Sequence, residues 1–147
     1  MMVLKTYYSW IDTAFVKYAP QPLQHLAAHN QVTKLGGKIV FYNGEDFETL
    51  STHSVVRAKI EQKPEVDGII FFTVKQFFNK GKLNLLFLQW ILDQGYEVHF
   101  SRENVSIFNK AILDDFFPLL YATHFVSQRD EPRQVWKPVW DLLPLSK

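Results

Sequence analysis

Polar and charged side chains that could bind or polarise a ligand follow four apolar segments of the chain. If these segments are parallel strands, their carboxyl ends meet along one edge of a sheet, which is where α/β proteins bind ligands. A carboxylate beside a lysine or arginine could hold or polarise a sugar, phosphate or carboxylate group there. The residues predicted at this rim are Ser9, Asp12, Asn43, Glu45, Asp46, Thr73, Lys75, Gln76, Ser101, Arg102 and Glu103.

Within this rim we predict Asp12 and Glu103 to be catalytic, together with His99, which ends a predicted strand next to Ser101 and Glu103. Strand alternation could equally point His99 into the protein interior. Exposed loops are also polar whether or not they bind anything. The predicted ligand-binding residues are Ser9, Glu45, Lys75, Gln76 and Arg102.

Two histidines have a spacing that occurs in metal sites. His25 and His29 lie four residues apart on a predicted helix, so both could face one ion. Leu26 stands where a zincin helix carries its glutamate, and spacing marks no third ligand. We therefore interpret the pair as polar residues on a solvated helix face and predict no metal site.

The sequence lacks the motifs of common cofactor and nucleophile sites. It contains no Gly-x-Gly-x-x-Gly turn, no phosphate-binding Gly-Lys-Ser/Thr and no Gly-x-Ser-x-Gly elbow. It also has no cysteine, which excludes disulfides, thiolate zinc sites and iron–sulfur clusters. We predict no cofactor.

The order of apolar segments predicts an α/β fold that would position the rim. Residues 67–75 are typical of a buried strand, 83–92 of an amphipathic helix ended by Gly95, and 96–103 of a second strand. Strands joined through a helix lie parallel in a sheet covered on both faces. We predict a three-layer, mostly parallel four-stranded sheet of resolvase-like or flavodoxin-like type with a C-terminal helix. The other predicted strands are 4–10 and 38–42, and the other predicted helices are 23–35, 53–62 and 107–121.

Composition and length favour one α/β domain over residues 1–127, followed by a docking tail at 128–147. The tail carries Trp136 and Trp140 among prolines, so we expect it to pack on its own domain or to join a homo-oligomer or partner protein. A net charge of +1 gives no general attraction to nucleic acid or anionic membranes. No apolar run approaches the ~20 residues that span a bilayer, and we expect a cytoplasmic protein.

The pattern of residues resembles the catalytic domain of serine recombinases (resolvases) over about the first two thirds of the chain. The matching residues are Tyr8, Gln21, Gln24, 67–72 and 97–100. On this resemblance, Asp12 stands at the family's serine nucleophile and Trp10 at its arginine, and the later arginines are missing from Lys75–Asn79. The resemblance therefore implies the fold without the recombinase activity, which needs the nucleophile and the guanidinium groups.

The chain more closely resembles the small sporadic carbohydrate cluster proteins of bacterial surface-glycan loci. This resemblance depends on Tyr8, Pro20-Gln21, 45–48, 68–70 and 97–103. It implies an accessory protein or small enzyme of nucleotide-sugar or glycan (lipopolysaccharide) biosynthesis, with a sugar or phosphate at the rim; whether it is an enzyme is left open. The alternative is a non-catalytic protein–protein interaction module that uses the aromatic segment Phe77–Trp90 and the tail.

Overall fold

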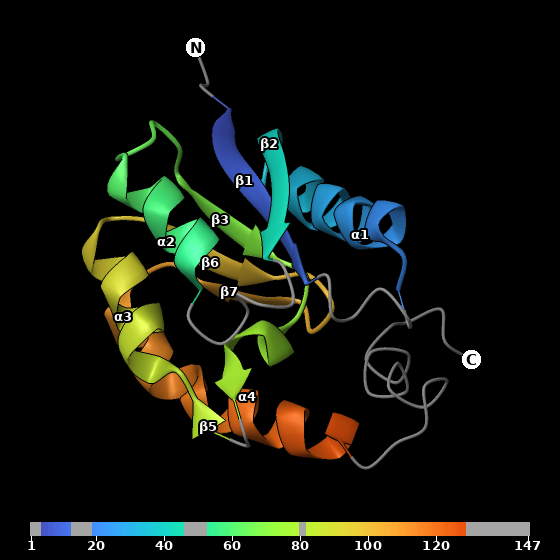
Figure 1. The fold of residues 1–147 in the computed structure, drawn as a ribbon, viewed down its shortest axis with the longest axis vertical. Helices are drawn as coiled ribbons and strands as arrows, with labels where there is room; N and C mark the ends of the chain where they lie inside the picture. Colours follow the sequence, from blue (N-terminus) through green and yellow to red (C-terminus); the bar gives the residue numbers. More distant parts are fainter. Residues whose placement is uncertain (1–3, 13–18, 46–52, 80–81, 129–147) are drawn as a thin grey trace.

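The structure is a computed structural model that describes residues 4–12, 19–45, 53–79 and 82–128. In this part of the chain a five-stranded sheet has the order β2-β1-β3-β6-β7 (Figure 1). Its first four strands pair in parallel, and β7 runs antiparallel to β6. A small antiparallel hairpin, β4–β5, stands apart from the sheet. The strands are β1 (Lys5–Asp12), β2 (Gly37–Glu45), β3 (Gly68–Phe71), β4 (Phe78–Asn79), β5 (Lys82–Leu83), β6 (Glu97–Phe100) and β7 (Val105–Ile107).

Helices cover both faces of the sheet and its carboxyl edge (Figure 1). Helix α1 (Gln21–Lys34) lies on one face, while α2 (Ser54–Glu61) and α3 (Leu85–Asp93) lie on the other. The 3₁₀ helix η2 (Val74–Phe77) follows β3, and α4 (Lys110–Gln128) packs against η2, β7 and α3. The molecule is therefore a three-layer α/β protein.

Local sequence signals account for the ends of α1 and α3. Helix α1 begins after Pro20 with Pro22 in its first turn, where a missing N–H costs nothing. The Asn84 side chain caps α3 by accepting a hydrogen bond of 3.2 Å from the Phe87 N–H. Gly36 and Gly95 end the two helices with φ of 76° and 92°, a conformation that side chains disfavour.

The core has two parts, one on each face of the sheet. The larger part, beneath α2, α3 and α4, is rich in aromatic rings, with Phe71, Phe77 and Phe100 in mutual contact. The smaller part packs Tyr7 and Ile70 against α1. All four residues of β3 are buried, as expected for a strand covered on both faces.

The prediction of a mostly parallel α/β sheet is confirmed, but the sheet has five strands, so the count of four is wrong. The predicted strand at 96–103 ends at Phe100, and the chain turns back through residues 101–104 to form β7. The predicted strand at 67–75 ends at Phe71 before η2. Apolar runs of this length do not reveal where a strand stops. Of the predicted tail, all but Gln128 lies outside the described residues.

No helix within the described residues is both long enough and apolar enough to span a membrane.

Candidate functional site

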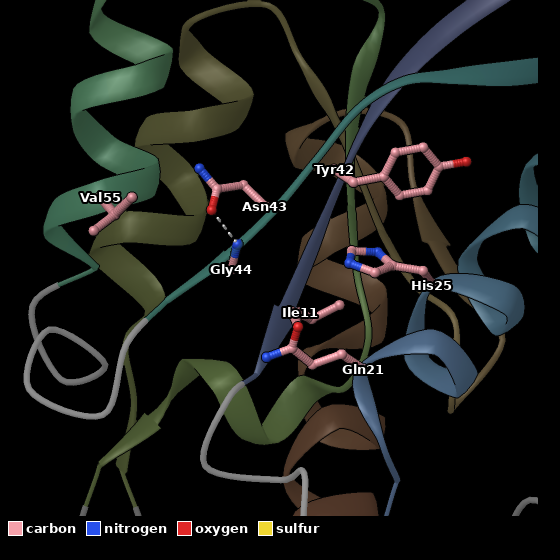
Figure 2. A pocket seen from close by; sticks show the side chains of 7 residues that line it. All are labelled: Ile11, Gln21, His25, Tyr42, Asn43, Gly44 and Val55. Atoms are coloured by element: carbon pink, nitrogen blue, oxygen red, sulfur yellow. Dashed lines mark hydrogen bonds between the residues drawn. The ribbon is translucent and has the colours of Figure 1, made fainter.

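A pocket of about 490 Å³ opens at the carboxyl ends of β1 and β2 (Figure 2). This volume lies within the range of small-molecule sites. Gly44 lets the two strand ends approach, because a Cβ there would lie 2.5 Å from Cγ1 of Ile11. The lining side chains come from β1, α1, β2 and α2: Ile11, Gln21, His25, Tyr42, Asn43, Gly44 and Val55.

His25 is held in this pocket by a buried hydroxyl group. Its Nδ1 lies 2.7 Å from Oγ of Ser9, which is buried on β1 beneath α1. The ring also makes an edge-to-face contact with Tyr42, with 4.9 Å between centroids. Burial lowers the pKa of His25, so the ring is neutral at pH 7. Its far edge points from α1 into the pocket (Figure 2), where it can exchange a hydrogen bond or a proton with a ligand.

The pairing of Ser9 with His25 differs from both sequence predictions. Ser9 was expected at the exposed rim and His25 on a solvated helix face. In the structure Ser9 is buried and positions the His25 ring, and His29 is exposed on α1. No local signal marks this pairing, because it depends on how α1 crosses the sheet.

The strand ends between β1 and β3 are closed by η2. The strand order reverses at this point, and open α/β sheets usually bind ligands there. Nε2 of Gln76 donates a 3.1 Å hydrogen bond to the Trp10 carbonyl, and Oε1 of Gln76 accepts one of 3.0 Å from the Thr73 N–H. The pocket consequently lies to one side, between β1 and β2.

Arg102 and Glu103 stabilise this closure from inside the protein. The Glu103 carboxylate accepts hydrogen bonds from Oγ1 of Thr73 (2.7 Å), the Val74 N–H (3.0 Å) and Nη1 of Arg102 (3.2 Å). Burial raises the pKa of Glu103, and the Arg102 charge opposes that effect. The predicted roles need an exposed rim, whereas Arg102 and Glu103 are only 2% and 7% exposed.

The other predicted rim residues do not converge on one place. Lys75 is half-buried on η2, and Oγ of Ser101 donates to the carbonyls of Phe71 and Phe72. Asp12 and Glu45 are register partners at the ends of β1 and β2. Their side chains lie outside the described part of the structure, as does the whole of Asp46. Of the predicted rim, Asn43 alone is among the pocket's described lining residues.

His99 lies in the interior, the alternative that strand alternation left open, and its partners are not Ser101 and Glu103. Its ring is fully buried, with Nε2 2.9 Å from Oε1 of Glu97 and Nδ1 2.8 Å from Oγ of Ser106. The prediction grouped it with Ser101 and Glu103. Those two residues lie in the turn beyond the end of β6, where strand alternation no longer applies.

Among the described residues, no group of three or more histidine, aspartate and glutamate side chains could hold a metal ion. Fold and pocket together define an α/β protein with a mostly parallel sheet and a small-molecule-sized cavity at its carboxyl edge. Comparisons with protein-family models, with curated proteins and with solved structures find no match to the chain. The resemblances to serine recombinases and to sporadic carbohydrate cluster proteins therefore stay predictions.

Proposed function

We propose that this protein binds a sugar, free or within a nucleotide sugar or glycan, in the pocket at the ends of β1 and β2. In this proposal it acts as an accessory protein or small enzyme of surface-carbohydrate biosynthesis. The chemistry of the lining supports the proposal: amide, imidazole and phenol groups stand beside apolar surface. Sites for small molecules combine apolar walls with a few convergent polar groups in this way.

The polar groups suit a ligand rich in hydroxyls. Oδ1 of Asn43 accepts a 2.8 Å hydrogen bond from the Gly44 N–H, so the Asn43 amide presents its NH₂ group as a donor (Figure 2). Gln21 supplies both a donor and an acceptor, and a neutral His25 supplies one of either. Tyr42, 49% exposed, adds an aromatic surface on which a sugar ring can pack.

The lining favours the sugar over a phosphate as the recognised group. None of the described lining residues carries a formal charge at neutral pH, because the pKa of His25 is lowered. Phosphate recognition usually uses arginine, lysine or a glycine-rich backbone cradle. The neutral His25 ring is the group that could take a proton from a bound hydroxyl if the protein is an enzyme.

Ligand binding is tested by thermal shift with neutral sugars, nucleotide sugars and sugar phosphates. A ligand at about 100 times its Kd should stabilise the native state by ~2.7 kcal/mol. Tyr42→Ala should remove this shift. Val40→Ala should keep it, because Val40 is 47% exposed on the same strand but does not line the pocket. A shift that both variants keep, or that inorganic phosphate reproduces, would contradict a sugar site.

The strand order β2-β1-β3-β6-β7 also supports the flavodoxin-like type of sheet, with β7 reversed. The alternative function, a protein interaction module, has less support. Phe77 and Phe87 of its expected aromatic surface are core residues, which leaves Leu86 exposed on α3. One exposed leucine is ordinary for a monomer.

A further inference from the structure

A hydroxyl, an imidazole and a carboxylate form a continuous series of hydrogen-bonded side chains across β6 and β7. Ser106 and His99 face each other in the antiparallel register, with 2.8 Å between Oγ and Nδ1. Glu97 lies two residues before His99 and contacts its Nε2 at 2.9 Å. The His99 ring is fully buried and meets the rings of Tyr7 and Phe108 edge-on. Ser106, the residue at the hydroxyl end of this series, is partly exposed.

The contacts of Glu97 determine where the protons lie. Burial alone would raise the pKa of Glu97, but hydrogen bonds from Lys5 (2.8 Å), His99 and Tyr7 (2.8 Å) together lower it. The carboxylate is thus ionised at neutral pH and can only accept hydrogen bonds. His99 must therefore carry its proton on Nε2.

This assignment leaves Nδ1 of His99 facing Ser106 as a base. Burial lowers the pKa of His99, which keeps the ring neutral and its Nδ1 lone pair available. The contact of 2.8 Å to Ser106 then has the hydroxyl as donor. A serine hydroxyl that donates to a neutral imidazole, itself oriented by a carboxylate, is the arrangement that activates a serine nucleophile.

We propose that Ser106 is a nucleophile for acyl transfer from esters, with His99 as its general base and Glu97 as the residue that positions the imidazole. The Ser106 oxygen forms a bond to the acyl carbon while its proton passes to Nδ1 of His99. The bond from that carbon to the leaving oxygen breaks, and the alcohol departs with the proton. Water then adds to the acyl carbon as its proton passes to Nδ1 of His99, the bond from that carbon to Oγ of Ser106 breaks, the carboxylic acid leaves, and Oγ takes the proton back from Nδ1. The exposed Phe108 ring beside His99 offers an apolar contact for the ester.

The test is covalent labelling with a fluorophosphonate, which reports an activated serine without needing the natural ester. We expect labelling of the whole chain at Ser106, located by peptide mass, and none in Ser106→Ala. His99→Gln should slow it about 100-fold or more, the usual contribution of a general base. Ser101→Ala is the matched control and should label normally, because the Ser101 hydroxyl donates to main-chain carbonyls.

A second variant keeps the test decisive if His99→Gln fails to fold. Glu97→Gln preserves size and should also slow labelling, with folding checked by circular dichroism. Tyr42→Ala should leave labelling unchanged, so failure of the sugar pocket and failure of this site are distinguishable. Labelling of Ser106 at the rate of an ordinary surface serine such as Ser54, or at an unchanged rate in a folded His99→Gln or Glu97→Gln variant, would overturn the proposal.

Discussion

The stability of this protein should fall with acid in part because of one buried histidine. His53 precedes α2, is 2% exposed, and stacks on Phe87 with 4.6 Å between ring centroids. Its Nδ1 is buried and has no hydrogen-bond partner among the described residues. Burial, and then the nearby positive charge of Arg57, lowers the pKa of His53 from 6.5 to about 4. A protonated His53 therefore does not fit the folded state.

The sign and size of the effect follow from proton binding. As pH falls below 6.5 the unfolded chain binds a proton at this histidine, whereas the folded chain does not until about pH 4. The contribution of His53 to the free energy of unfolding must therefore decrease across this window and level off below it. Each pKa unit is worth ~1.4 kcal/mol, so the interval from 6.5 to about 4 costs ~3 kcal/mol.

Urea unfolding at several pH values between about 7 and 4 measures this cost. His53→Asn is the suitable variant, because φ is 54° there and asparagine tolerates that conformation. We expect the variant to be less stable near neutral pH by ~1 kcal/mol through lost stacking. It should then lose less stability than the wild type on acidification. The control His29→Asn, at an exposed histidine, should lose as much stability on acidification as the wild type. If the free energy of unfolding of His53→Asn fell with pH in parallel with that of the wild type, the reasoning would be refuted.

Two further substitutions test the packing that forms the site. Glu103→Ala breaks the buried ion pair with Arg102 and should lower the free energy of unfolding by ~3–5 kcal/mol. The control Asp93→Ala breaks an exposed ion pair and should change it by less than ~1 kcal/mol. Equal losses of stability in urea unfolding would contradict a stabilising role for the buried pair. Gly68→Ala should lower the free energy of unfolding by ~1–3 kcal/mol, because its Cβ would lie 2.5 Å from the Glu97 carbonyl oxygen. An unchanged midpoint of urea unfolding would show that β3 and β6 can move apart without loss of stability.

Periodic patterns predicted the types of the elements well. The strand near residues 4–10, the helix near 53–62 and the helix near 83–92 all appear, as β1, α2 and α3. These segments carry their information locally, in apolar spacing and in end signals such as Gly95. The end of β6 carries no such signal, and so the turn at 101–104 and β7 were missed.

The limit of local sequence information also explains why the predicted rim residues do not form one exposed site. Arg102 and Glu103 follow an apolar strand, and in the sequence this position is typical of an exposed polar rim. In the fold they are buried, and Glu103 accepts a hydrogen bond from Thr73, 30 positions away. Ser9 and Lys75 stand near the ends of predicted strands in the same way, yet Ser9 lies under α1 and Lys75 lies on η2. Polar type and position along the chain do not distinguish a binding group from a buried partner.

By itself, the sequence determined that this protein is an α/β domain with a mostly parallel sheet and that polar residues follow its strands. Whether a segment forms a helix or a strand depends on residues a few positions apart, so the sequence predicts it. Only the tertiary structure decided which polar groups meet: Ser9 with His25 at the pocket, and Glu97, His99 and Ser106 across β6 and β7. Those meetings depend on strand order, register and helix placement, and a one-residue shift in register would turn each side chain to the opposite face.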